Sequence, residues 1–335
     1  MIPARRDDPS SRNDPALLDR LRQVAGSITG RVALAVVDRN HEPHVRLALV
    51  RSSEDTTFEI GSISKGLTGM LLADGLRGGG ISLETTIGEI WPTIDGSQLA
   101  SVTLLELATH TSGLPKMPHG WSAAIDALPY ALFGRNPYRG SPDSVIAVAA
   151  RQPLRSRGRR NYSNIGGAVL GGALATVGST DYSSLLTQQV LVPLEMTATS
   201  VSVEGHTAPW GRASFGLPRE PWVLGGYAPA GGLLSTIGDM VRLATALLEG
   251  SAPGMAALDP IDGVQTDRPY RQTGLFWIID GPPDQIPPIT WHNGGTGGYS
   301  SFIALMPDVG RAVVGLQSVA GRSGRLQRIA LALAS

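Results

Sequence analysis

Strand-like and helix-like segments follow one another along the chain in an order that permits few folds. Apolar runs that alternate with polar residues, or continue without interruption, predict strands near both ends of the chain. The predicted strands cover residues 31–38, 45–51, 57–60, 274–279, 289–292, 299–306 and 311–318, and residues 308–310 form a plausible hairpin turn. Strands at both ends with helices between them predict a sheet assembled from the two termini.

The middle of the chain is mostly helical. Apolar residues recur every three to four positions and predict helices over residues 17–24, 62–77, 104–110, 143–150, 165–177, 182–192, 237–249 and 325–334. We therefore expect a discontinuous α/β sheet domain formed by residues 1–80 and 222–335. A mainly helical subdomain of residues 81–221 is inserted into it.

Composition excludes several classes of function. Hydrophobic residues make up 42% of the 335 residues and charged residues 17%, which is typical of a soluble globular protein. The 28 basic side chains balance the 28 acidic ones, so charge gives no reason to expect a nucleic acid or an anionic membrane as partner. The chain has no cysteine, which excludes disulfides, thiolate metal sites and a cysteine nucleophile.

Signals for export, membrane insertion and cofactor binding are missing as well. The start, MIPARRDDPSSRNDP, has charges but no apolar stretch after them, and no window reaches the roughly 18 apolar residues of a membrane span. The patterns GxGxxG after a strand, the P-loop, HExxH and the nucleophile elbow GxSxG do not occur. We predict a cytoplasmic protein without cofactor or metal.

Ser62 and Lys65 lie three residues apart at the start of a predicted helix, in FEIGSISKGLTG. Side chains at this spacing share one helical face, so the lysine amine can reach the serine hydroxyl. A neutral lysine beside a serine is a workable general base. Only two of the 28 basic residues are lysines, at 65 and 116, and a lysine can lose its proton where arginine cannot. The structural alternative makes Ser62 a helix N-cap and Lys65 a solvent-facing residue.

Two further motifs carry groups suited to catalysis. Tyr162-Ser163-Asn164 precedes an apolar helix; a phenol can relay a proton and an amide can orient a carbonyl or an amine. The glycines of WHNGGTGGYSS (291–301) let a ligand approach the backbone and expose N–H groups, as an oxyanion hole needs, and His292 adds a possible hydrogen bond. The structural alternatives are a half-buried tyrosine with an N-capping asparagine, and a glycine-rich turn with an incidental histidine.

Together and in this order, the three motifs resemble those of the serine β-lactamase and penicillin-binding-protein-like hydrolases. The branch with class C β-lactamases, D-aminopeptidases and family VIII esterases is the most similar, and its Ser-x-x-Lys, Tyr-x-Asn and Lys/His-x-Gly motifs stand here as Ser62/Lys65, Tyr162/Asn164 and His292/Gly294. Further matches are LLELATHTSGLP (104–115), PLEMTATS (193–200) and PAGGLLSTIGDMVRL (229–243), so that the resemblance extends from about residue 30 to 318. It implies a β-lactamase-like α/β (α+β) fold, with a central antiparallel sheet flanked by helices and an active site between the two domains.

The resemblance also implies a role for each residue. Ser62 attacks a carbonyl carbon and forms an acyl-enzyme, while Lys65 and Tyr162 share the acid–base work. The N–H groups of Ser62 and Gly295 form the oxyanion hole, and Asn164 steadies Lys65 and the substrate. His292 replaces the lysine that typical class C enzymes use for the substrate carboxylate, and an ordinary histidine is mostly neutral at pH 7.

The function predicted from these features is a serine hydrolase, with a carboxylesterase or related acyl hydrolase for small or hydrophobic esters as first choice. The same residues also suit a β-lactamase, a D-aminopeptidase or amidase, or an acyltransferase. A catalytically silent binding relative is a third class. The expected partner is a small-molecule ester or amide, and the sequence leaves the oligomeric state open.

Several other residues have two interpretations. His110 is interpreted as a loop-stabilising residue. The basic run 155–160 is interpreted as a solvated loop, with the alternative that Arg159 or Arg160 contacts an acidic substrate. An aromatic segment suits either an acyl pocket or the core, and it contains Trp121, Tyr130, Phe133 and Tyr138.

Overall fold

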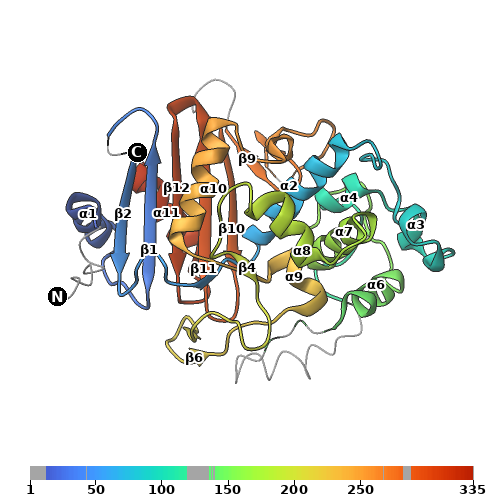
Figure 1. Cartoon of the computed structure of the whole chain (residues 1–335), viewed down its shortest axis with the longest axis horizontal. Coiled ribbons are helices and arrows are strands. Elements are labelled where there is room, and N and C mark those ends of the chain that lie inside the picture. Colours follow the sequence, from blue (N-terminus) through green and yellow to red (C-terminus); the bar gives the residue numbers. More distant parts are fainter. Residues whose placement is uncertain are drawn as a thin grey trace, which may run out of the picture.

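A seven-stranded antiparallel sheet forms one half of the molecule (Figure 1). The structure is a computed structural model that describes residues 13–42, 44–118, 136, 138, 140–266, 268–281 and 288–334. The strand order is β2-β1-β12-β11-β10-β9-β8. The strands are β1 (Val32–Asp38), β2 (Val45–Val50), β8 (Arg271–Thr273), β9 (Ile278–Asp280), β10 (Ile289–Gly295), β11 (Ser300–Met306) and β12 (Arg311–Gln317).

The two ends of the chain meet in the centre of this sheet. Strand β1 pairs with β12 along its whole length, from Val32 opposite Gln317 to Asp38 opposite Arg311. Every residue of β1 is buried, as its unbroken apolar sequence VALAVVD predicts for a central strand covered on both faces. The predicted antiparallel sheet built from both termini is therefore confirmed.

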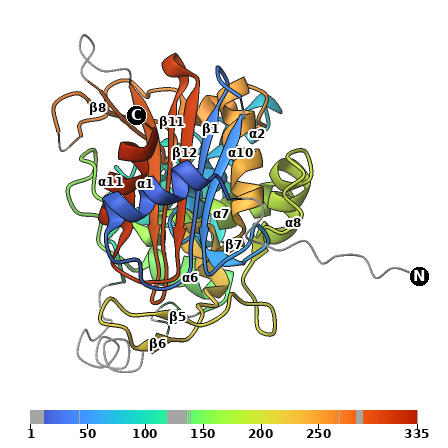
Figure 2. The ribbon, with the colours of Figure 1, turned by 90° about the vertical axis from the view of Figure 1, so that its left-hand side faces the viewer.

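Helices cover both faces of the sheet (Figure 2). Because successive side chains point to opposite faces, Leu34 and Val36 pack with α1 (Pro15–Ala25) and α11 (Ser323–Ala334) in one apolar cluster. Ala33 and Ala35 face the other way, into a larger cluster that includes residues of the remaining helices. The N-cap Asp14, whose carboxylate accepts the Leu17 N–H at 2.7 Å, fixes the start of α1.

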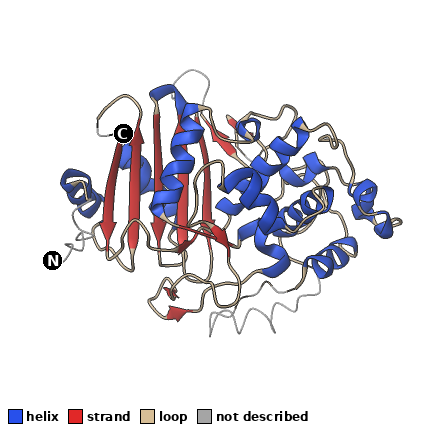
Figure 3. Cartoon of the chain, in the orientation of Figure 1, coloured by secondary structure: helices blue, strands red, loops and turns tan. Residues whose placement is uncertain are grey.

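The other helices lie beside the sheet, apart from α10, which lies across one face of it (Figure 3). They are α2 (Ile63–Arg77), α3 (Ile87–Ile90), α4 (Leu104–Ala108), α6 (Pro142–Ala150), α7 (Asn164–Val177), α8 (Tyr182–Leu186), α9 (Ala228–Gly231) and α10 (Ile237–Glu249), the last of which packs on β1 and β12. The division into a sheet domain and a helical subdomain at residues 80 and 221 stays a prediction. No helix in the described ranges has the length and apolar character to cross a membrane.

Three segments differ from the sequence-based expectation. The strand predicted over 274–279 is two short strands, β8 and β9, joined by a turn in which Phe276 has a φ of 67°. The helix predicted over 182–192 changes after α8 into a π-helical turn, Thr187–Leu191. The glycine-rich motif does not begin with a turn, because β10 continues through His292 to Gly295.

A second, three-stranded sheet places the start of α2. It has the order β3-β7-β4, with β3 (Phe58–Glu59), β7 (Leu233–Ser235) and β4 (Ser200–Val201). The Ser301 hydroxyl of β11 donates to the Ile60 carbonyl at 2.7 Å and ties this small sheet to the large one. A separate hairpin consists of β5 (Gly211–Arg212) and β6 (Pro218–Arg219).

Candidate active site

Ser62 stands at the junction between the small sheet and helix α2. The chain leaves β3, turns at Gly61 with a φ of 52°, and enters α2 directly after Ser62. Ser62 occupies the N-cap position, but its side chain makes no capping hydrogen bond. The hydroxyl oxygen instead accepts a hydrogen bond from the Tyr162 phenol at 2.6 Å. Ser62 is therefore the N-cap by position, as the structural alternative expected, but its hydroxyl contacts Tyr162 and not the helix backbone.

Lys65 is completely buried, so the solvent-facing alternative is wrong. Its Nζ lies 2.8 Å from the Asn164 Oδ1, 2.5 Å from the Ala230 carbonyl oxygen and 3.4 Å from the Ser62 Oγ. Burial holds the pKa of Lys65 well below its usual value, and the charge of Lys116 lowers it further. A neutral amine has two N–H bonds and one lone pair. When both N–H bonds go to the two carbonyl oxygens, the lone pair faces Ser62.

Tyr162 lies on the other side of the serine oxygen. Its ring also packs against Lys65, with the Nζ 4.7 Å from the ring centroid. Burial raises the pKa of Tyr162 to about 12, against the lowering effects of the Ser62 hydrogen bond and of Arg160. The phenol therefore keeps its proton near neutral pH and serves as a hydrogen-bond donor to Ser62.

Helix α7 positions the amide of Asn164. Ser163 is the N-cap, with its hydroxyl accepting the Gly166 N–H at 2.9 Å, so Asn164 is the first helical residue and not the cap. The Asn164 Oδ1 accepts from Lys65, while its Nδ2 donates to the Tyr138 hydroxyl at 2.6 Å. Asn164 thus links the lysine to an aromatic residue of the pocket.

Strand β10 brings the third motif to the same place. A Cβ atom built on Gly61 would lie 2.7 Å from the Gly295 nitrogen, which shows how closely β10 passes the residue before the serine. Ser62 and Gly295 line one small cavity together. Gly294 lies in β10 against Ile60, and Gly295, at the end of the strand, is exposed.

His292 is buried and neutral. Burial lowers the pKa of His292 to about 3. Its Nδ1 lies 2.7 Å from the Asn293 carbonyl oxygen, so this nitrogen carries the proton and donates it. The side chain therefore offers no positive charge to a substrate carboxylate.

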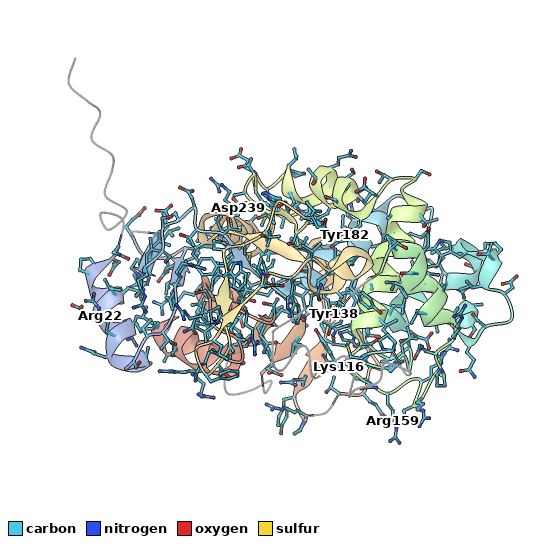
Figure 4. The ribbon with its side chains drawn as sticks, turned by 90° about the horizontal axis from the view of Figure 1, so that it is seen from below. Arg22, Lys116, Tyr138, Arg159, Tyr182 and Asp239 are labelled. Carbon is cyan, nitrogen blue, oxygen red and sulfur yellow. The ribbon has the colours of Figure 1, made fainter. Side chains whose placement is uncertain are left out.

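Aromatic and small residues form the cavity next to Ser62. Its volume is about 40 Å³. The lining residues are Ser62, Tyr138, Asn164, Trp222, Leu224, Tyr227, Ala230, Gly231 and Gly295. The Tyr138 ring packs on Trp222 and Tyr227, with ring centroids 5.6 and 5.3 Å away, so the rings support one another. Figure 4, which shows the molecule from below, labels Tyr138 of this cavity and Lys116.

Sequence analysis indicated some of the residues around Ser62 and missed others. Tyr138 lies in the pocket, as one of its two interpretations proposed; Trp121, Tyr130 and Phe133 lie outside the described residues. Arg160 acts on the site, because its charge lowers the pKa values of Tyr162, His110 and His292. The carbonyl of Ala230 and the rings of Trp222 and Tyr227 were missed, since they carry no catalytic motif.

Comparison with known proteins agrees with this geometry. The chain is 27% identical to "Beta-lactamase" of Escherichia coli (strain K12) over 296 residues, which cover 76% of this chain and 74% of that protein. It is 26% identical over 290 residues to "D-alanyl-D-alanine-carboxypeptidase/endopeptidase AmpH" of the same organism, covering 79% and 72%. A solved structure described as "A class C beta-lactamase" has the same fold, with a TM-score of 0.78 and 18% identity over 95% of both chains. The family model "Beta-lactamase" matches residues 22–335, and the chain therefore belongs to the Beta-lactamase family.

Proposed function

We propose that the protein is a serine acyl hydrolase that forms an acyl-enzyme on Ser62 and acts on small, uncharged esters. Membership of the family makes it a serine hydrolase of the β-lactamase type. The observation that carries the finer proposal is the arrangement around the serine oxygen. A phenol donor lies 2.6 Å away and a buried amine 3.4 Å away, with both amine hydrogens directed at carbonyl oxygens.

Acylation begins with a proton transfer from Ser62 to Lys65. The lone pair of neutral Lys65 takes the hydroxyl proton while Oγ forms a bond to the substrate carbonyl carbon, and the carbonyl π electrons move to its oxygen. The N–H groups of Ser62 and Gly295 then stabilise this oxyanion. Ser62 stands at the N-terminus of α2, where backbone N–H groups have no partner inside the helix and favour negative charge.

Release of the alcohol requires a second proton. Tyr162 gives its phenol proton to the leaving oxygen as the bond from carbon to that oxygen breaks. The proton held by Lys65 then moves to the phenolate, which restores both groups. A water molecule repeats these steps in reverse order on the acyl-enzyme, releases the carboxylic acid and regenerates Ser62.

The pocket favours a short acyl group without charge. Its small volume and the rings of Tyr138, Trp222 and Tyr227 leave room for a few carbon atoms beside Ser62. The neutral, buried His292 supplies no cation for a substrate carboxylate. Both features favour an acetyl or similar ester over a penicillin.

A β-lactam or D-amino-acid peptide is the second candidate substrate. Two cations, Lys116 and Arg160, act on the catalytic groups, and such charges attract a substrate carboxylate. The curated relatives named above carry the names of a β-lactamase and of a D-alanyl-D-alanine carboxypeptidase. The cytoplasmic location stays a prediction, whichever of the two substrates the protein takes.

The test compares substrates and the mass of the intact protein. Wild type and Ser62→Ala are incubated with p-nitrophenyl acetate, p-nitrophenyl hexanoate and nitrocefin, with Ser64→Ala as the neighbouring serine control. We expect faster turnover of the acetate than of the hexanoate, little turnover of nitrocefin, and an acyl mass increment that Ser62→Ala lacks. Faster nitrocefin turnover would favour the second candidate, and ester turnover unchanged by Ser62→Ala would reject both.

A further inference from the structure

Tyr162 has to be held in place by something other than regular secondary structure. It lies in the segment 161–163, between a loop and the start of α7, and this segment belongs to no strand or helix. No ladder of backbone hydrogen bonds therefore fixes the phenol at 2.6 Å from the Ser62 Oγ. The residue that holds it packs against its ring.

His110 contacts the chain on both sides of Tyr162. The His110 carbonyl oxygen accepts the Asn161 N–H at 2.8 Å, and the His110 Nδ1 accepts the Ser163 N–H at 3.2 Å. Between these two hydrogen bonds the imidazole ring lies against the phenol ring, with centroids 4.7 Å apart and planes inclined by 47°. The buried His110 thus makes three contacts around a single residue, one through its backbone carbonyl and two through its ring.

The backbone of His110 adopts an unfavourable conformation to make these contacts. His110 has a φ of 63°, in the left-handed region that side chains other than glycine rarely occupy. Phe276 packs on the far face of the imidazole at 5.0 Å and has a φ of 67° itself. Its N–H donates to the Ala108 carbonyl at 2.8 Å, at the end of α4. Two unfavourable conformations at one contact are typical of functional sites.

The contact with Ser163 exists only while His110 is neutral. An imidazole nitrogen that accepts a hydrogen bond carries no proton, so the proton lies on Nε2. Burial keeps the pKa of His110 well below its usual value, and Lys65 and Arg160 lower it further. The buried Nε2 finds no hydrogen-bond partner among the described residues. An unpaired N–H is unfavourable in a core, so packing alone does not explain a histidine here.

We propose that His110 is the positioning residue of Tyr162: its two hydrogen bonds and its ring hold the phenol in the orientation that reaches Ser62. His110 acts through Tyr162, because no hydrogen bond joins it to Ser62 or Lys65 in the part of the chain that the structure describes. The inference rests on the proposed proton transfer by Tyr162. It adds a purpose to the sequence-based interpretation of His110 as a residue that stabilises a loop, since residues 161–163 belong to no helix or strand.

The test is a double-mutant cycle with p-nitrophenyl acetate. His110→Leu fills the space with an apolar side chain and removes the ring and its Nδ1 acceptor; His110→Asn restores an acceptor and tolerates a positive φ. We expect His110→Leu to lower kcat about 10- to 100-fold with KM within about twofold, since small displacements of a catalytic group have such effects. His110→Asn should recover about tenfold of that loss. In a Tyr162→Phe background, His110→Leu should change kcat by less than about twofold.

Two results would overturn the proposal. Equal losses of kcat in both backgrounds would show that His110 acts independently of the phenol. An equal loss of kcat in Leu174→Ala, which removes buried side-chain atoms of α7 far along the helix, would show that lowered stability suffices. Full turnover by Tyr162→Phe alone would instead reject the role of Tyr162, and the inference about His110 with it.

Discussion

At the residue scale, burial sets the protonation state of each group around Ser62. It lowers the pKa of Lys65 and raises that of Tyr162, which favours the neutral amine and the protonated phenol that the proposed acylation needs. It also keeps His292 neutral above about pH 3. One physical cause thus favours both the proposed base and the proposed acid, which lie on either side of one hydroxyl oxygen as hydrogen-bond partners of Ser62.

The pH dependence of ester hydrolysis should follow Lys65. Only the neutral amine accepts the serine proton, so kcat/KM falls as the pH drops through the lowered pKa of Lys65 and is constant above it. We expect the His292→Gln variant to show the same fall in kcat/KM at the same pH. The Lys65→Arg variant should lose about 10³-fold or more in activity, because an arginine side chain cannot lose its proton. Profiles between about pH 4 and 9 check both statements. A fall that disappears in His292→Gln would contradict the assignment to Lys65.

Glu59 should limit stability at high pH. Burial raises the pKa of Glu59 to about 7, although Thr296 and the Trp222 N–H lower it. The folded state then holds a proton that the unfolded state releases near its ordinary pKa, so stability declines as the pH rises between these two values. We expect Glu59→Gln to raise the free energy of unfolding by about 1–3 kcal/mol at pH 8, with no gain at pH 4. Urea unfolding checks this, with the exposed Glu249→Gln as control.

The candidate catalytic residues could be named from sequence because their chemistry is visible in their types and spacing. Ser62 and Lys65 share a helical turn, and Tyr162 and Asn164 belong to one short motif. Their surroundings were not predictable in the same way. Ala230 contributes a backbone carbonyl, which every residue has. His110 contacts Ser163, which lies 53 residues further along the chain, and no local pattern predicts such a contact.

At the element scale, the approach of β10 to the residues before Ser62 is so close that it depends on glycine. A Cβ atom on Gly294 would lie 2.0 Å from the Ile60 carbonyl oxygen and 2.3 Å from the Ser301 Oγ. On Gly295, the nearest atom would be 3.5 Å away, an ordinary contact. Neighbouring positions of one strand therefore differ sharply in what they tolerate.

Gly294→Ala should separate β10 from the small sheet. We expect it to lower the free energy of unfolding by about 2–3 kcal/mol and to reduce ester hydrolysis, because overpacking moves the backbone that carries the Gly295 N–H. Gly295→Ala should change stability by less than about 0.5 kcal/mol. Urea unfolding of both variants checks the difference. Equal stability of the two would contradict the close approach of β10 to Ile60.

The elements themselves were predictable where a period was clear, and not where tertiary contacts decide. Helices α1, α2 and α10 begin and end close to the predicted positions, because apolar spacing and flanking residues define them. Between 274 and 277 the chain leaves the sheet instead. The Phe276 N–H bonds to Ala108, and this long-range contact has no local sequence signal.

At the scale of the whole molecule, the two termini are joined by an ion pair as well as by strand pairing. Arg311 of β12 donates through Nε to the Asp38 carboxylate of β1 at 2.8 Å. Burial alone would raise the pKa of Asp38, but the Asn40 N–H and Arg311 hold it at about 2. Its contribution to stability is therefore present above the ordinary pKa of Asp and is lost as the pH falls to about 2.

Asp38→Asn should show this loss directly. We expect the difference in free energy of unfolding between wild type and Asp38→Asn to shrink by about 2 kcal/mol between pH 5 and pH 2. Asp19, whose pair with Arg22 is exposed, is the control, and Asp19→Asn should show a change of less than about 0.5 kcal/mol. Urea titrations at several pH values check the prediction, and parallel curves for both variants would contradict it.

The order of strands along the chain has a consequence for synthesis on the ribosome. Asp38 and Arg311 are 273 residues apart, so at about 5–20 residues per second β1 waits roughly 14–55 s for its partner β12. During that time the apolar hairpin of β1 and β2 has an open edge, the part of a sheet most prone to pair with other chains. Ser62 is likewise made long before Gly295 can reach it. The nascent chain therefore carries the proposed nucleophile without the proposed oxyanion hole until the final strands have emerged.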